Sequence, residues 1–330
     1  MVLALSRGHS AAAAIRPDTG PATIHRLVAL EGSEDHLAWE ARQRIPAAIA
    51  AVTAAVLTFV GTVWRALTLS DLPTNGVLDS LGRAAEPGPL GELESLRVNT
   101  FQYYDEQSLG VLLASLVVAV GYVALGWALT YLAVAARARR PEFPRPLVYV
   151  PLIAGALQAL ATVLSALATN AAIGDFLAGS RTVEAAQEVS GSGLGVFASL
   201  LGLPGALGLA LALVLISLNA MRVGLLTRFM GVLGMITGAL QILPFGGPLP
   251  VVQCFWLLLL AMLFLGRWPN GQPPAWRTGN AEPWPASARQ RQRAQAAAAR
   301  SGQAADPEPE PLTASGSASA SARKRKRKRR

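Results

Sequence analysis

Polar side chains inside long apolar stretches are the first candidates for chemistry in this chain. Gln158, Gln241 and Gln253 lie in such stretches, and Tyr122 lies in another. Amides and phenols at such positions either join neighbouring helices through hydrogen bonds or line a small polar cavity. The residues alone leave both interpretations open. The second one predicts that these four side chains converge.

The centres of the apolar stretches after the first contain no Asp, Glu, Lys, Arg or His. Arg65 lies near the end of the first stretch, where it either extends to the membrane interface or pairs with acids of the following loop. Without a buried carboxylate or histidine, a proton-coupled pump has no carrier. The nearest acid–base candidates are Asp105 and Glu106 beside Tyr103 and Tyr104, which we expect at the interface.

Residue types that hold metals or act as nucleophiles are few. His9, His25 and His36 all precede the first apolar stretch and are not at metal-ligand spacing. The single cysteine, Cys254, has no base near it in the sequence, and the glycine-rich Gly191–Gly195 lacks the lysine of a phosphate loop. We therefore expect no catalytic site, no metal and no cofactor.

Arginines gather in the short segments between apolar stretches. The candidates for contact with anions at one membrane face are Arg137, Arg139, Arg140, Arg222 and Arg228. Their position suggests contacts with lipid headgroups or with an acidic partner.

The elements that carry these residues must be membrane helices. Charged residues make up 15% of the 330-residue chain and the mean hydropathy is +0.38, whereas about 25% of residues are charged in soluble domains. This composition indicates an all-α, polytopic membrane protein.

Six apolar stretches are long enough to be considered as membrane spans. They cover Pro46–Leu67, Leu109–Ala133, Leu147–Thr169, Leu194–Leu218, Phe229–Phe245 and Leu249–Gly266. The last two are short for a hydrocarbon layer of about 30 Å. Pro204, with its neighbouring glycines, either serves helix packing or breaks the fourth span at a substrate site.

The distribution of arginine predicts the orientation. Five arginines precede the first span, four follow the second and two follow the fourth, whereas the segments after the first, third and fifth spans hold two, one and none. Positive residues remain on the cytoplasmic side. Six spans with both termini in the cytoplasm of a bacterial cell satisfy this rule.

The two ends of the chain differ from the predicted membrane domain at 45–267. Residues 1–44 are expected to be mostly disordered, with a short interfacial helix from Ser33 to Arg44. Residues 268–330 form a low-complexity tail, in which Trp268, Trp276 and Trp284 are expected along the inner interface.

The last eight residues of this tail, Arg323–Arg330, are all basic and supply most of the net charge of +9. They suit a solvated tail or attraction to anionic lipid, and no aromatic residue is interleaved among them for nucleic-acid stacking. The expected partners are thus the bilayer and its anionic lipids, with nucleic acid disfavoured.

One fragment carries a resemblance to a known family. Asn219–Pro285 contains Arg222, Leu225–Leu226 and Arg228 in an R-x-x-L-L-x-R loop, followed by Gly234 and Gly238 at G-x-x-x-G spacing. It resembles the bacterial membrane family called domain of unknown function four-three-eight-six, in an actinobacterial variant. The resemblance implies a multi-pass fold and no catalytic activity.

The favoured function from the sequence is a non-enzymatic integral membrane protein that organises the bilayer or a partner through its basic inner face. The alternative is a transporter or channel for a small uncharged or lipophilic solute, which would use the three glutamines.

Overall fold

Helices make up the regular structure of the described chain. The computed structural model describes residues 21–73, 76–85, 88–89, 91–242, 250–269 and 271–282, with side chains from His36 onward. Its helices are α1 (Pro21–Thr68), α2 (Val77–Ala84), α3 (Val98–Glu106), α4 (Ser108–Arg139), α5 (Arg145–Ala178), α6 (Val183–Ser190), α7 (Gly193–Arg222), α8 (Arg228–Ile242), α9 (Val251–Phe264) and α10 (Pro274–Thr278). Among described residues the only β contact is an isolated bridge between Glu94 and Thr182. The predicted all-α class is confirmed.

Four helical stretches are long and apolar enough to cross a membrane. They are His36–Thr68, Ser108–Arg139, Arg145–Ala178 and Val183–Arg222. The other two apolar helices, α8 and α9, have 15 and 14 residues. At 1.5 Å per residue each is about 21–22 Å long, less than the roughly 30 Å of hydrocarbon.

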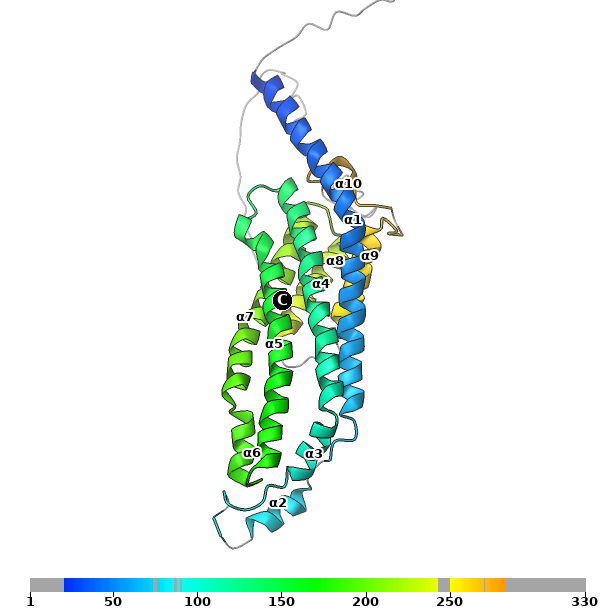
Figure 1. Ribbon diagram of the computed structural model, residues 1–330. Helices are drawn as coiled ribbons and strands as arrows, with labels where there is room; N and C mark the ends of the chain where they lie inside the picture. Colours follow the sequence, from blue (N-terminus) through cyan, green and yellow to red (C-terminus); the bar gives the residue numbers. More distant parts are fainter. Residues whose placement is uncertain are drawn as a thin grey trace, which may run out of the picture. The chain divides into compact units, whose positions relative to one another are not determined.

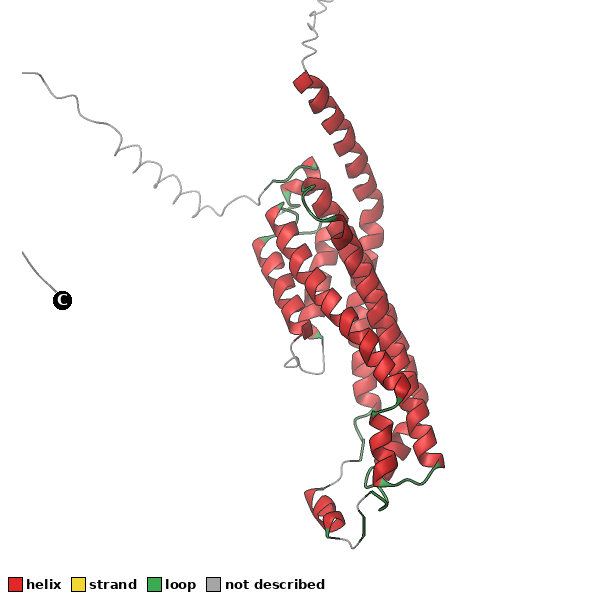
Figure 2. Cartoon of the chain, turned by 90° about the vertical axis from the view of Figure 1, so that its left-hand side faces the viewer, coloured by secondary structure: helices red, strands yellow, loops and turns green. Residues whose placement is uncertain are grey.

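The six apolar helices form a ring in which each packs on the next. α1 packs on α4, α4 on α5, α5 on α7, α7 on α8, α8 on α9, and α9 returns to α1. α8 and α9 lie beside one end of the long helices and stop well short of the other (Figures 1 and 2). The loop-side helices α2, α3 and α6 lie at that other end (Figure 1).

Glycines allow the closest helix contacts. A Cβ added at Gly126 of α4 would lie 2.6 Å from the carbonyl oxygen of Pro151, and one at Gly155 of α5 would lie 2.7 Å from that of Tyr122. A Cβ at Gly238 would lie 2.8 Å from the Ala210 carbonyl oxygen, so the predicted close approach at this G-x-x-x-G spacing occurs between α8 and α7.

One prediction about helix continuity, and one of the two interpretations that the sequence left open for Pro204, differ from the structure. α1 is one helix from Pro21 to Thr68 that passes through Pro46, where a short interfacial helix after a disordered segment was expected. α7 is helical throughout Gly193–Arg222, with Pro204 inside it. The interpretation of Pro204 as a break in the fourth span is therefore wrong.

The large buried side chains concentrate at one end of the ring, where α8 and α9 complete it. They include Leu125, Leu129, Leu132, Leu213, Ile216, Leu225, Leu226, Met230, Trp256 and Phe264. We call this the basic end, because Arg139, Arg145, Arg222 and Arg228 lie there, at the ends of α4, α5, α7 and α8.

The packed unit continues beyond α9. The described residues of α10 still pack against the bundle, since Arg139 donates to the Ala275 carbonyl and Trp276 donates to the Leu225 carbonyl. Residues 243–249 between α8 and α9, Trp284 and the basic run Arg323–Arg330 lie outside the described residues.

Candidate functional site at the basic end

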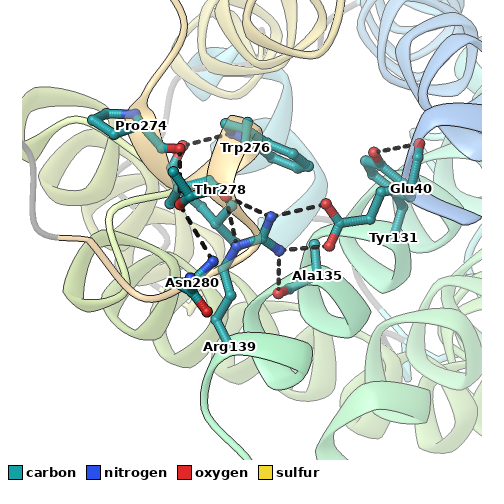
Figure 3. Close-up of polar contacts among 10 residues, drawn as sticks. Glu40, Tyr131, Ala135, Arg139, Pro274, Trp276, Thr278 and Asn280 are labelled. Carbon is teal, nitrogen blue, oxygen red and sulfur yellow. Dashed lines mark hydrogen bonds and ion pairs between the residues drawn. The ribbon is translucent and has the colours of Figure 1, made fainter. Parts of the chain in front are cut away.

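An ion pair between α1 and α4 lies at the centre of the basic end. Nη1 of Arg139 lies 2.5 Å from Oε1 of Glu40 and Nη2 lies 2.9 Å from Oε2, so the contact is bidentate (Figure 3). Only 1% of the Arg139 side chain and 5% of the Glu40 side chain are exposed. Such a fork-to-fork contact is the strongest geometry for this pair.

The remaining donors of Arg139 are also satisfied. Nη1 donates to the Ala135 carbonyl at 2.8 Å, while Nε and Nη2 donate to the Ala275 carbonyl at 3.1 and 2.8 Å. Arg139 therefore ties α1, its own helix and α10 together. A buried charge with this many partners is an element of structure, and it offers no free site to a ligand.

Aromatic rings enclose this ion pair. Trp276 of α10 lies over the guanidinium of Arg139, with 5.3 Å between Cζ and the ring centroid, which is a cation–π contact. Tyr131 stacks on Trp276 at 6.0 Å and donates from its hydroxyl to the Glu40 carbonyl at 3.1 Å. The indole N–H of Trp276 donates to the Leu225 carbonyl at 3.1 Å.

A second link joins α1 to the end of α9. Nε of Arg44 donates to the carbonyl oxygen of Phe264, the last residue of α9. Gly279, at φ 72°, ends α10 in the left-handed conformation, and a Cβ there would lie 3.3 Å from Leu37 of α1. The chain after α9 is thus held against α1 at several points. We call the group Glu40, Tyr131, Arg139, Ala275 and Trp276 the clamp.

The clamp corrects two predictions. Arg139 was expected to contact anions at the membrane face, but it is buried against Glu40. Trp276 was expected along the interface, but only 9% of it is exposed. In the sequence Glu40 has the spacing to pair with Arg44, whereas in the structure its partner lies 99 residues away.

The other four predicted anion contacts remain at least partly exposed. Arg137 is half-buried, and Arg222 and Arg228 are exposed. Arg140 donates to Glu142 at 3.1 Å and from Nη1 to Oδ1 of Asn219 at 3.4 Å. Arg137 borders a cavity of about 520 Å³, which Arg145 and His36 also line.

The three glutamines of the predicted polar cavity lie in two different helix interfaces. Nε2 of Gln241 donates to Oε1 of Gln253 at 2.6 Å, so this pair joins α8 to α9. Gln158 lies between α5 and α7, where a Cβ at Gly205 would be 3.0 Å from its Oε1. Tyr122 is partly buried and packs against the main core.

The acids and tyrosines that the sequence placed beside one another lie on α3. Asp105 and Glu106 are exposed, and the Tyr103 hydroxyl donates to the Thr68 carbonyl at 3.3 Å. Burial raises the pKa of the Tyr104 phenol, and the positive charge of Arg65 opposes that rise. Within the described residues no three His, Cys, Asp or Glu side chains gather as metal ligands.

Comparison of the chain with protein-family models, with curated proteins and with solved structures gives no match. The resemblance of Asn219–Pro285 to the domain of unknown function stays a prediction.

Proposed function

We propose that this chain is a non-enzymatic, multi-pass protein of the bacterial cell membrane that anchors a basic tail at the inner membrane face. The observation that carries the proposal is the clamp. Because Arg139 and Trp276 hold α10 against α1 and α4, the chain leaves the bundle for its tail from a fixed point. The tail would gather anionic lipid or an acidic partner there.

The orientation in this proposal follows from the arginines. Arg140, Arg145, Arg222, Arg228 and Arg267 all lie at helix ends on the basic end, which the positive-inside rule assigns to the cytoplasm. The assignment of both termini to this side does not depend on α8 and α9. The pair of helices α8 and α9 either crosses the membrane twice or enters and leaves at the same face. In both cases the chain after α9 returns to the side on which α8 began.

The geometry favours an anchor over a solute carrier. A carrier using the glutamines needs them in one cavity, and they are divided between the α5–α7 and α8–α9 interfaces. The buried ionisable pair Glu40–Arg139 is fully hydrogen-bonded and so is poorly suited to carry a proton.

The proposal is tested with the full chain in vesicles of phosphatidylcholine containing a small fraction of fluorescent phosphatidylglycerol. The wild type should concentrate the labelled lipid around itself, measured by energy transfer. A variant with all eight residues Arg323–Arg330 replaced by glutamine should lose most of this effect, since each basic residue contributes nominally about 1 kcal/mol.

The matched control replaces the five arginines of this run by lysine and so preserves its charge. This variant should behave as the wild type does, and 1 M salt should abolish the effect in both. Equal lipid redistribution by the glutamine variant and the wild type would refute the proposal, as would hydrolysis or modification of lipid by the purified protein.

A further inference from the structure

A groove runs along α4 between α1 and α5. Both helices pack on α4 and lie on either side of it (Figure 1). Two cavities adjoin in this groove, one of about 230 Å³ and one of about 520 Å³, and Val134 of α4 lines both. Each cavity takes its lining from all three helices.

The smaller cavity is mainly apolar and lies deeper along the bundle. Trp127, Val134 and Leu152 contribute to its walls. Trp127 is 51% exposed, so this part of the groove opens to the outside of the helix ring. In a membrane this surface faces acyl chains.

The larger cavity is basic and lies at the basic end. Arg137, Arg145, His36 and Tyr149 line it, and none of the described residues that line it is acidic. Among the described residues, neither the Arg137 nor the Arg145 side chain has a hydrogen bond or an ion pair, whereas the side chains of Arg139 and Arg140 pair with Glu40 and Glu142. The nearby carboxylates of the described chain are therefore already engaged by other arginines.

We propose that the groove between α1 and α5 binds one anionic glycerophospholipid from the leaflet at the basic end. Its phosphate lies between Arg137 and Arg145, and the upper part of an acyl chain lies along Val134, Leu152 and Trp127. The basic cavity suits the phosphate of such a lipid, and the apolar cavity suits its acyl chain. The basic cavity lies at the basic end and the apolar cavity lies deeper along the bundle, which is the order of headgroup and acyl chain in one leaflet of a bilayer.

The dimensions agree with this assignment. Trp127 and Arg137 are ten residues apart on α4, which corresponds to about 15 Å along a helix. Guanidinium groups suit phosphate because they donate two parallel hydrogen bonds. Tyr149 also lines the cavity, and its hydroxyl can donate a further hydrogen bond.

The same geometry selects an anionic lipid over a zwitterionic one. A choline or ethanolamine group carries a positive charge that needs an acid or an aromatic cage. The described lining of the basic cavity offers two arginines and a histidine instead. This inference makes no use of the tail, so its failure and that of the proposed anchor are separable.

The test measures which lipids remain on the full-length protein during purification in mild detergent. Protein from membranes with equal phosphatidylglycerol and phosphatidylcholine is analysed by native mass spectrometry. The wild type should retain phosphatidylglycerol in preference. The double variant Arg137→Gln/Arg145→Gln should retain about tenfold less, as expected from the loss of two charge-assisted contacts.

The matched control is Arg42→Gln/Arg277→Gln, which removes two exposed arginines from the same end that do not line the groove. It should retain phosphatidylglycerol as the wild type does. Equal loss in both double variants would overturn the proposal, because the effect would then be one of general charge. Equal retention in wild type and the Arg137/Arg145 variant would also overturn it.

Two further measurements use only the wild type and remain valid if the variant fails to fold. A photoactivatable phosphatidylglycerol should cross-link within residues 36–43 or 127–152, which line the groove, and cross-links confined to other segments would contradict the site. Glycerol 3-phosphate, which has no acyl chains, should not displace the bound lipid at equal concentration. Displacement by it would mean that the site binds free phosphate esters.

Discussion

Arg139 is the residue whose role changes most between sequence and structure. In the sequence it is one of three arginines within Arg137–Arg140. In the structure the helix turns it inward, while its neighbours at 137 and 140 remain partly exposed. An ion taken out of water is stabilised only by close, complete pairing, and Glu40, Ala135 and Ala275 provide it.

Removing one partner of this ion pair should be far more harmful than removing both. Glu40→Ala leaves a buried guanidinium without its carboxylate and should cost about 3–5 kcal/mol of unfolding free energy. The double variant Glu40→Leu/Arg139→Met should recover much of this loss. Denaturant unfolding in detergent, followed by helical circular dichroism, measures both.

The exposed pair Arg140–Glu142 provides the control for this measurement. Its side chains are 37% and 79% exposed, so Glu142→Ala should change stability by less than about 1 kcal/mol. Similar costs for Glu40→Ala and Glu142→Ala would show that the clamp is not a stabilising feature.

Trp276 fixes the chain after α9. Trp276→Ala removes the stacking on Tyr131, the contact with Arg139 and the hydrogen bond to the Leu225 carbonyl. We expect a loss of about 3–5 kcal/mol and faster tryptic cleavage at the neighbouring exposed Arg277. Trp64→Ala, at a residue 39% exposed, should leave that cleavage rate unchanged. An unchanged rate in the Trp276 variant would contradict the clamp.

At the scale of the elements, the contact between α4 and α5 depends on Gly126. An added methyl group there would meet the Pro151 carbonyl oxygen at 2.6 Å, and backbone atoms can move aside only if the helices separate. Gly126→Ala should therefore cost about 1–3 kcal/mol, measured by thermal unfolding.

Gly174 of α5 is the matched control for this substitution. It is also helical, but an added Cβ there meets nothing within 4 Å. Gly174→Ala should raise the unfolding temperature, because alanine is favoured over glycine in a helix by up to about 1 kcal/mol. The same sign for both substitutions would show that the α4–α5 contact is not limited by this glycine.

Two of the glutamines also act in the contact between neighbouring helices. Gln241 and Gln253 join the ends of α8 and α9 that approach the connecting turn, so their structural role is to close a short hairpin. This is the first of the two interpretations that the residues left open, and in apolar surroundings such a hydrogen bond is worth about 0.6–2 kcal/mol.

For the whole molecule, the orientation can be tested by labelling intact cells with a membrane-impermeant thiol reagent. Cys254 is 7% exposed, so the background of the wild type should be low. Ser80→Cys, in exposed α2, should react from outside, and Ser315→Cys should react only after the cells are opened. Reaction at Ser315 but not at Ser80 in intact cells would invert the proposed orientation.

The sequence alone determined the all-helical class, the four long apolar helices and the gathering of arginines at one end. These are properties of local composition, because a run of apolar residues has few alternatives to a helix in a membrane. The short length of the last two apolar runs was also visible in the sequence, and the count of six spans stays a prediction.

Only the tertiary structure decided which polar residues meet. Glu40 and Arg139 are 99 residues apart. Ala275 accepts from Arg139 through its backbone carbonyl, a group that every residue type has, so its identity does not reveal the contact. The rotation of α4 about its axis decides that Arg139, and not Arg137 or Arg140, is buried in the ion pair. Trp276 is buried because α10 packs back against α1. Such choices depend on packing between distant segments, since the free energy of a buried charge is set by whichever groups surround it.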